Sequence, residues 1–470
     1  MKRRGFGFGG WLALVALAGF LLRLAYVLVL REPHIPFGGD PGYYTTGADL
    51  LAGGHGFVKP VALGVFHQSA SHPPLYLLWL AIPSLVWNHQ ATQLVDLVWT
   101  CVLGTGTVVV VGLAGREIAG RRVGLIAAAL AAVYPNLWVQ DGMLRAESAA
   151  IFVVALILLL SYRFLHRPTL PRLLWLGVAC GLAALARSEL LLVVPFVLVP
   201  VVVLARGIGT RTKVGWAVAG SAVALVVITP WVAYNMSRFD TPVYLSTNSG
   251  GTVSAANCRS TYSGDLLGFK DYGCALRAWN TARRHDPRWN QRDEAQQDAA
   301  VQTEAERYVK AHLSRVPVVV AARWGRILGV YRPFQEVRYD KAVLQQEWTV
   351  GYSIVWSFWI FAVLAAAGVV VLRRRATPVW PLLALPAIVF VSVAITFAQT
   401  RYRSPAEVAV VLLAAVAIDA LARWFARRRT ARAGTEDDRV IDLAALEAPE
   451  PPVGAEPVGD ELPVAPRPTG

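Results

Sequence analysis

The sequence predicts an all-α polytopic membrane protein with about ten or more transmembrane helices and a small extracytoplasmic domain of mixed secondary structure. Of its 470 residues, 55% are hydrophobic and only 16% are charged, whereas soluble domains carry about 25% charged residues. The apolar residues also gather in runs of roughly twenty, the length that crosses a bilayer as a helix. Composition and run length together therefore exclude an ordinary soluble domain.

The first apolar run follows a short basic N-terminus, a pattern that a cleaved signal peptide shares. No small-residue cleavage site precedes Arg31, so we interpret this run as a retained span. A later run, residues 75–87, is short and flanked by Trp and Tyr, which favours an interfacial or re-entrant helix. The ten expected spans are residues 11–30, 92–114, 123–138, 148–162, 173–186, 190–204, 214–231, 350–372, 379–397 and 405–425.

The net charge of +14 is best explained by membrane orientation, because Lys and Arg cluster between the apolar runs. Short cytoplasmic loops carry an excess of Lys and Arg. With the N-terminus inside, the ten spans put every strong basic cluster on the cytoplasmic side, and no nucleic-acid partner is expected. These clusters are residues 2–4, 116–122, 163–172, 206–213, 373–375 and 427–429.

The same count of spans places five ionisable residues together at the opposite, outer face. They are Asp40, His72, Glu147, Arg187 and Arg401. Ionisable groups at a membrane are costly and tend to serve function. We therefore predict a site at the outer face of a plasma-membrane protein.

The polar stretch between the seventh and eighth spans combines turn-rich sequence with a helical run, and we expect it to form the small extracytoplasmic domain. The end of the chain is rich in Pro, Glu and Asp and is expected to be disordered. The expected division is a cytoplasmic N-terminus (1–10), a transmembrane module that carries the candidate site (11–232, with outer loop 31–71), the extracytoplasmic domain (233–346), C-terminal transmembrane helices (347–425) and a cytoplasmic tail (426–470).

The four cysteines fall into two classes. Cys101 and Cys180 lie inside apolar runs and are expected to be buried small hydrophobes. Cys258 and Cys274 lie in the polar segment, where a disulfide would contribute about 2–4 kcal/mol if the segment is extracytoplasmic. No CxxC or Cys/His spacing indicates a metal site.

The first outer loop carries Gly38-Gly39-Asp40-Pro41-Gly42-Tyr43-Tyr44. By itself this stretch fits a tight turn or a helix cap, because Asp and Gly suit turns. Its position next to a span, together with the other four outer ionisable residues, favours a catalytic carboxylate instead.

Several motifs resemble the GT-C superfamily of membrane glycosyltransferases, in particular bacterial lipid A aminoarabinose transferases and protein O-mannosyltransferases. Asp40 followed by two tyrosines and His72-Pro73-Pro74-Leu75-Tyr76 begin the pattern. The order and spacing of the motifs carry the resemblance over roughly residues 10 to 425. The further motifs are Arg145-Ala146-Glu147, Gly181–Arg187, Thr229-Pro230-Trp231, Ser246–Gly251 and Arg401–Glu407.

The resemblance implies a polyprenyl-phosphate sugar donor, used at the outer face, with Asp40 as the base. Two departures from the pattern matter. Aminoarabinose transferases tend to have Lys-Pro-Pro where this chain has His72-Pro73-Pro74, which alters the expected phosphate contact. Protein O-mannosyltransferases pair two acids in the first loop, whereas Pro41 follows Asp40 here, which weakens the case for a protein acceptor.

Glycosyl transfer needs a base for the acceptor hydroxyl and cations for the departing phosphate. Arg401, Arg187 and His72 are the candidates for the phosphate, although Arg187 also fits snorkelling and His72 also fits a helix cap. Tyr43, Tyr44 and Tyr402 complete the expected substrate contacts. Glu147 has three open roles: assisting Asp40, holding a divalent cation, or capping its helix, and Asp141 competes with it for these roles. No definite cofactor is implied, and a divalent cation stays an open alternative.

We therefore predict an inverting glycosyltransferase that moves a hexosyl or pentosyl unit from a polyprenyl-phosphate donor to an envelope glycan, lipid or protein acceptor, surrounded by membrane lipids. A multispan transporter or a flippase of envelope precursors is the first alternative. Transporters show repeat symmetry with broken helices, and no such halves are visible in the sequence. A ligase that moves a whole oligosaccharide is the second alternative.

Overall fold

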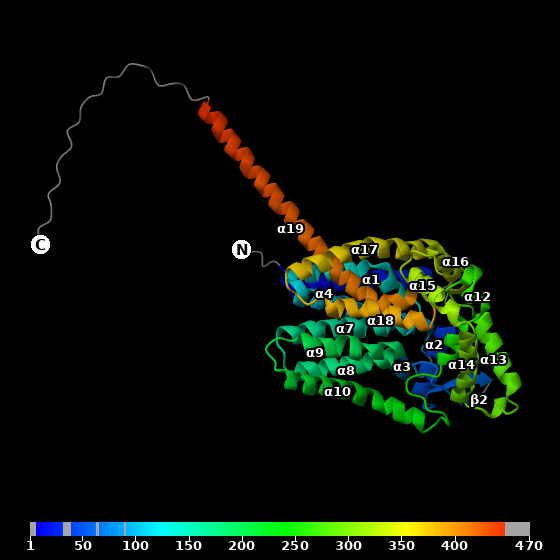
Figure 1. Cartoon of the computed structure of the whole chain (residues 1–470). Coiled ribbons are helices and arrows are strands. Elements are labelled where there is room, and N and C mark those ends of the chain that lie inside the picture. Colours follow the sequence, from blue (N-terminus) through cyan, green and yellow to red (C-terminus); the bar gives the residue numbers. More distant parts are fainter. Residues whose placement is uncertain (1–5, 32–38, 63–64, 89–90, 447–470) are drawn as a thin grey trace, which may run out of the picture. The chain divides into compact units, whose positions relative to one another are not determined.

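The computed structural model describes residues 6–31, 39–62, 65–88 and 91–446, most of which are helical (Figure 1). The chain forms two compact units, Met1–Asp419 and Ala420–Gly470. The strands are β1 (Val58–Ala62) and β2 (Val65–Gln68). The α-helices are α1 (Phe8–Tyr26), α2 (Gly39–Ala52), α3 (Leu75–Val86), α4 (Gln93–Ala119), α5 (Arg121–Val133), α6 (Pro135–Trp138), α7 (Glu147–His166), α8 (Leu170–Ala186), α9 (Val199–Leu204), α10 (Thr210–Met236), α11 (Ser249–Ala256), α12 (Arg259–Tyr262), α13 (Tyr272–His285), α14 (Glu294–Ala311), α15 (Val316–Ile327), α16 (Pro333–Leu344), α17 (Trp348–Arg374), α18 (Trp380–Ile395) and α19 (Thr400–Leu446).

Six helices in the described part of the chain are long and apolar enough to cross a membrane. A seventh crossing arises if α5 and the segment Pro135–Gly142, bent by 63° at Tyr134, act as one span. The bend follows from Pro135, which starts a new helix because its preceding residue avoids helical backbone. The six are Phe8–Arg31, Gln93–Ala119, Glu147–His166, Thr210–Met236, Trp348–Arg374 and Thr400–Arg429.

Three further predicted spans fall on shorter apolar helices, namely Leu170–Ala186, Ser188–Leu204 and Trp380–Ile395. Each is shorter than the roughly 20 residues that a perpendicular crossing needs. The membrane character of the protein is therefore clear, whereas the count of ten stays a prediction. The run predicted as an interfacial or re-entrant helix is α3, which has 12 residues.

The helices of the bundle pack closely where small residues face each other. α8 contacts α10, and α4 contacts both α5 and α7. A side chain at Gly177 of α8 would approach the carbonyl oxygen of Gly220 in α10 to 2.5 Å. Such close approach is typical of helix pairs in membranes, where apolar packing replaces the hydrophobic effect.

The long helices carry different charges at their two ends. In α7, Glu147 is the first residue and Arg163 lies in the last turn, about 24 Å away at 1.5 Å per residue. Arg187 follows α8 on the side of Glu147, whereas Arg373 lies in the last turn of α17. The predicted site residues Glu147 and Arg187 thus lie near the same ends of their helices. Basic residues without a predicted site role lie in the last turns of α7 and α17.

The segment between α10 and α17 is helical, and α11, α13 and α14 contact one another (Figure 1). The prediction of mixed secondary structure here is wrong for the described residues, since the two strands belong to the first outer loop. The turn-rich stretch 246–252 leads into α11, where small residues allow close packing on α14: the Gly250 amide donates to the Asp298 carboxylate. Cys258 and Cys274 form a disulfide, with their Cα atoms 6.2 Å apart.

The expected disordered tail coincides in part with the second unit. α19 continues to Leu446, and the predicted disorder of the tail stays a prediction. Strong helix formers such as Ala and Arg dominate residues 420–433, which explains why the helix does not stop at the end of the apolar run. Residues 447–470 lie outside the described part of the chain.

Candidate active site

A cavity of about 1060 Å³ lies within the first unit, where the start of α2, the residues before α3 and several helix ends meet the segment between α10 and α17, here called the 237–347 segment. One part of its wall is polar and includes seven of the predicted site residues, and the other part is apolar. The apolar wall comes mainly from α18, with Leu385, Ile388 and Val389 among its residues. The predicted site residues on the wall are Asp40, Tyr44, His72, Glu147, Arg187, Arg401 and Tyr402.

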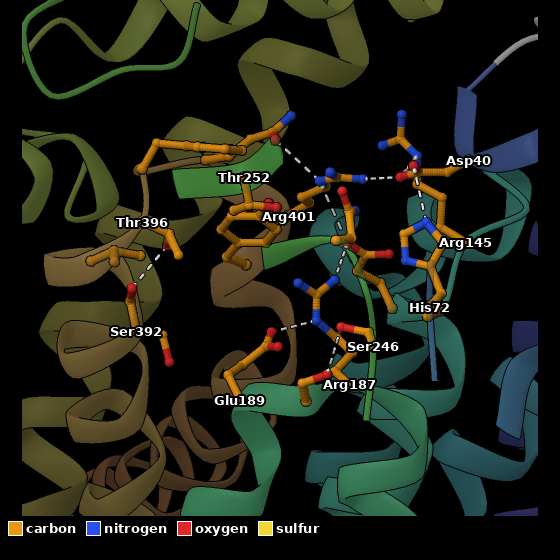
Figure 2. Close-up of a pocket in the computed structure, with 18 of the residues that line it drawn as sticks. Asp40, His72, Arg145, Arg187, Glu189, Ser246, Thr252, Ser392, Thr396 and Arg401 are labelled. Carbon is orange, nitrogen blue, oxygen red and sulfur yellow. Dashed lines mark hydrogen bonds and ion pairs between the residues drawn. The ribbon is translucent and has the colours of Figure 1, made fainter. Parts of the chain in front are cut away.

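Asp40 lies in the first turn of α2, after Gly39, whose φ of 68° suits glycine and turns the chain into the helix. Figure 2 shows its carboxylate facing three basic side chains. Arg401 Nη1 donates to Asp40 Oδ2 at 2.5 Å, while Arg145 Nε lies at 3.8 Å and His72 Nε2 at 3.7 Å. The loop residue that the sequence singled out therefore contacts two arginines more than a hundred residues away, in addition to His72, rather than acting as a simple turn residue.

Burial alone would raise the pKa of Asp40, but the charges of Arg401, His72 and Arg145 outweigh it and hold this pKa well below the ordinary 3.8. Burial lowers the pKa of His72, against the opposing charge of Asp40. Asp40 is therefore an ionised carboxylate at neutral pH.

Glu147 and Arg187 form a second ion pair beside the first. Arg187 Nη1 donates to Glu147 Oε1 at 2.6 Å, and its Nε donates to Glu189. Arg401 Nε lies 3.6 Å from the same Glu147 oxygen, so the Glu147 carboxylate contacts both Arg187 and Arg401. Both guanidinium groups also lie over the ring of Tyr402, at 4.8 Å for Arg187 and 5.2 Å for Arg401.

The three open roles of Glu147 can now be compared. It is the first residue of α7, as a cap would be, yet its carboxylate is buried and bound to arginines in the cavity wall. Its competitor Asp141 lies elsewhere: its carboxylate accepts a 2.7 Å hydrogen bond from Arg23 of α1, and both side chains are almost fully buried. Asp141 does not line the cavity.

The tyrosines of the first loop take different positions. Tyr44 lines the cavity, and its ring lies 5.2 Å from that of His72. Tyr43 does not line the cavity and packs edge-on against His72 at 5.0 Å. On a helix, consecutive residues point in directions about 100° apart, so Tyr43 and Tyr44 have different neighbours. The predicted role of Tyr43 as a substrate contact stays a prediction.

The donor set does not fit a resident divalent cation. Each cavity carboxylate already contacts a guanidinium group, and a cation would compete with these arginines for the same oxygens. In the described part of the chain, the one group of three potential ligands with close atoms is Cys258, Asp271 and Cys274, and its two cysteines are joined in the disulfide.

Sequence reasoning missed several residues of the cavity wall. Arg145 was visible within the Arg-Ala-Glu motif and could have been found from it. Lys270, Tyr272 and Tyr339 line the cavity too, but they come from the polar 237–347 segment and no local pattern marks them. Ser246 reaches the wall because Trp231 Nε1 donates to the Leu245 carbonyl at 2.8 Å and fixes that turn.

Glu294, the first residue of α14, joins two stretches of the cavity wall. Its Oε1 accepts from the Ala70 amide at 3.0 Å, the Ser71 hydroxyl at 3.2 Å and the Thr247 hydroxyl, and its Oε2 pairs with Lys59 at 2.6 Å. These contacts fix the backbone directly before His72 and directly after Ser246.

We expect Glu294→Ala to displace this wall, since hydrogen bonds to a charged group contribute about 1.5–3 kcal/mol each. The expected result is a lower melting temperature and a roughly 10-fold higher KM for transfer, with Glu294→Gln in between. Glu306→Ala on the exposed side of the same helix is the matched control. Unchanged melting and KM in Glu294→Ala would show that Glu294 does not position the wall.

Comparison with known proteins agrees with this architecture. Residues 71–234 match the family model described as dolichyl-phosphate-mannose-protein mannosyltransferase. The matched region contains His72, Glu147 and Arg187, but neither Asp40 nor Arg401. No curated protein matches the chain significantly.

Solved structures match over most of the chain. The Archaeoglobus fulgidus oligosaccharyltransferase in complex with Zn and sulfate is 14% identical, with a TM-score of 0.54 over 93% of this chain and 51% of that one. Archaeal oligosaccharyltransferase AglB from Archaeoglobus fulgidus, in complex with an inhibitory peptide and a dolichol-phosphate, is 16% identical, with a TM-score of 0.53 over 90% and 52%. ArnT from Cupriavidus metallidurans bound to undecaprenyl phosphate is 14% identical over 87% and 78%, but its TM-score of 0.44 is too low to support an argument.

This chain spans about half the length of the oligosaccharyltransferases that it matches. At such low identity, the similarity to these solved structures shows a shared fold and no more. The family model matches about a third of the chain. Within those limits the resemblance seen in the sequence is confirmed: the chain shares the fold of the archaeal oligosaccharyltransferases, and its residues 71–234 match the family model of dolichyl-phosphate-mannose-protein mannosyltransferases.

Proposed function

We propose that this protein is an inverting glycosyltransferase that moves a monosaccharide from a polyprenyl-phosphate donor to an acceptor of the cell envelope, at the outer face of the plasma membrane. One observation carries the proposal. The ionised Asp40 and two arginines meet at the polar part of a cavity whose remaining wall is apolar. Such a cavity suits a donor with a sugar, a phosphate and a hydrocarbon chain.

The outer-face assignment is supported by the charges of the helix ends. The site lies on the side of Glu147 and Arg187, whereas the basic clusters at the ends of α7 and α17 fit the cytoplasmic side. A lipid-linked donor fits this placement, because nucleotide sugars stay in the cytoplasm. The proposed plasma-membrane location follows the same reasoning.

In the proposed step, the oxygen of an acceptor hydroxyl attacks the anomeric carbon of the sugar from the face opposite the phosphate. The bond between that carbon and the phosphate oxygen breaks, and the configuration inverts. Asp40 takes the hydroxyl proton, and polyprenyl phosphate leaves with the bonding electron pair. Arg401 and Arg187 donate to its oxygens and stabilise the charge that develops there.

The low pKa of Asp40 makes it a weak base in the empty cavity, whereas efficient bases have a pKa near the working pH. The ion pair with Arg401 suggests how donor binding changes this. When a phosphate accepts from Arg401, the guanidinium is drawn toward the phosphate and its hold on Asp40 weakens. The pKa of Asp40 then rises in the presence of donor, as base catalysis requires.

The size of the transferred group separates the proposed function from one alternative. The matched family model names a monosaccharide donor, dolichyl-phosphate-mannose, which supports a monosaccharide. The matched solved structures are oligosaccharyltransferases, and this favours the transfer of a whole oligosaccharide as the second candidate.

The test is to offer purified protein in nanodiscs a panel of radiolabelled undecaprenyl-phosphate monosaccharides, an undecaprenyl-linked oligosaccharide, and cell-envelope extract as acceptor. We expect label to pass from a monosaccharide donor with inversion at the anomeric carbon. Transfer from the oligosaccharide donor alone would establish the second candidate. Movement of lipid across vesicles without any sugar transfer would overturn both in favour of a flippase.

A further inference from the structure

The cations that line the cavity differ in one respect. Arg145, Arg187 and Arg401 each lie within 4.0 Å of a carboxylate oxygen. Lys270 lines the same cavity, yet among the described residues its amine has neither an ion pair nor a hydrogen bond. Any anion that approaches the arginines must compete with the carboxylates of Asp40, Glu147 and Glu189. At Lys270 an anion meets no such competing carboxylate.

Four aromatic rings surround the Lys270 amine. Its nitrogen lies 4.2 Å from the centroid of Tyr339, 5.3 Å from Tyr272, and 5.7 Å from both Phe269 and Phe397. Ring faces within about 6 Å attract a cation, but they accept no strong hydrogen bond. The side chain is only 4% exposed, so its three N–H donors are withdrawn from bulk water without protein acceptors.

A buried ammonium group in this state is costly, because desolvation is repaid only by a charged partner with good geometry. The charged groups that influence it are Arg401 of α19, Asp340 and Glu336 of α16, and Arg145. The titratable rings that face it are Tyr339 of α16 and Tyr272 of α13. Burial, and after it the charge of Arg401, lower the pKa of Lys270 to about 7. Burial and Glu336 raise the pKa of Asp340 to about 7, so this acid is a weak counter-ion.

We propose that Lys270 is a second anion-binding position in the cavity, which receives a phosphate or carboxylate oxygen of a bound substrate inside its ring of aromatic side chains. The anion belongs either to the lipid carrier or to the acceptor. This deepens the proposed function, because it adds a binding group to the same cavity on the wall formed by the 237–347 segment.

The experiment measures binding rather than transfer. The full chain in nanodiscs is titrated with undecaprenyl phosphate, undecaprenol and inorganic phosphate. The variants are Lys270→Met, which keeps the apolar stem, Lys270→Arg, which keeps the charge, and Lys310→Met as the matched control, since Lys310 of α14 has an exposed side chain. If the carrier phosphate is the anion, Lys270→Met lowers the affinity for undecaprenyl phosphate at least 10-fold and leaves the affinity for undecaprenol unchanged. Lys270→Arg and Lys310→Met then bind undecaprenyl phosphate as the wild type does.

If the anion belongs to the acceptor, Lys270→Met keeps its affinity for undecaprenyl phosphate and loses binding of inorganic phosphate. Unchanged binding of both anions would overturn the proposal. A wild-type protein that binds lipid phosphate through Lys270 but transfers no sugar would contradict the proposed function and leave the anion position intact.

A second measurement applies if Lys270→Met does not fold. Lys270 is charged below pH about 7 and neutral above it, whereas arginine stays charged. Anion affinity of the wild type should therefore fall about 10-fold from pH 6 to pH 8.5 relative to Lys270→Arg. A purely structural lysine gives both proteins the same pH profile, which would refute the proposal.

Discussion

Asp40→Asn is expected to lower kcat for sugar transfer by about 100- to 10,000-fold, the range that a general base contributes, while the protein stays folded in the membrane. Asparagine has nearly the same shape but cannot take the acceptor proton, and it no longer forms the ion pair with Arg401. Because the carboxylate is partly exposed in the cavity rather than packed in the core, its loss should cost little stability. The measurement is the initial rate of labelled sugar transfer, with a melting curve of each protein.

Asp265→Asn serves as the matched control, since this aspartate is highly exposed and outside the cavity. Donor binding should persist in Asp40→Asn, because Arg401 is then free to pair with the phosphate. A variant with full activity would remove Asp40 from the role of base and leave Glu147 and Glu189 as the remaining carboxylates of the cavity.

Asp141→Ala is expected to destabilise the protein by about 3–5 kcal/mol, the cost of leaving one charge of a buried pair without its partner. Arg23 lies inside the first span and is almost fully buried. It also donates to the carbonyls of Gly19 and Ala132, but Asp141 supplies its one counter-charge in the described contacts. Gly104 leaves the space for this pair, since a Cβ there would lie 1.9 Å from Asp141 Oδ2.

Replacing both members, as in Arg23→Met with Asp141→Leu, should recover most of the loss, because apolar side chains of similar volume often substitute well for a buried pair. Unfolding in nanodiscs of the wild type, both single variants and the double variant gives the coupling energy between the two residues. Any variant that folds should also keep its transfer rate. Lost activity in a stable double variant would return Asp141 to the candidates for catalysis.

The contrast between Asp141 and Glu147 shows where sequence reasoning ended. Both are acids near the start of the same span, and nothing local separates them. Their partners decide their roles, and those partners, Arg23 and Arg187, lie 118 and 40 residues away. Hydrophobic runs are local signals, so the long apolar helices begin within about five residues of their predicted starts, whereas α19 continues well past the predicted end of its span at residue 425. Ion pairs across the bundle are not local, and neither are positioning groups such as Glu294.

The same limit explains Lys270 and Tyr43. A lysine in a polar segment is expected to be solvent-exposed. Lys270 is buried because it packs against the rings of Tyr272, Tyr339 and Phe397, the last two of which come from distant parts of the sequence. Tyr43 and Tyr44 are equivalent in the sequence, but the start of α2 turns one toward the cavity and the other behind His72. The mixed secondary structure predicted for residues 233–346 is not found because turn-forming residues there, such as those at the start of α11, begin helices.

The contact between Asp40 and Arg401 joins residues 361 positions apart. At a synthesis rate of about 5–20 residues per second, the ribosome needs roughly 20–70 s to make the chain between them. During that time the first loop and most of the bundle exist without their last helix. The nascent chain therefore completes this ion pair only when nearly all of it has been inserted, and a product released before position 401 lacks half of it.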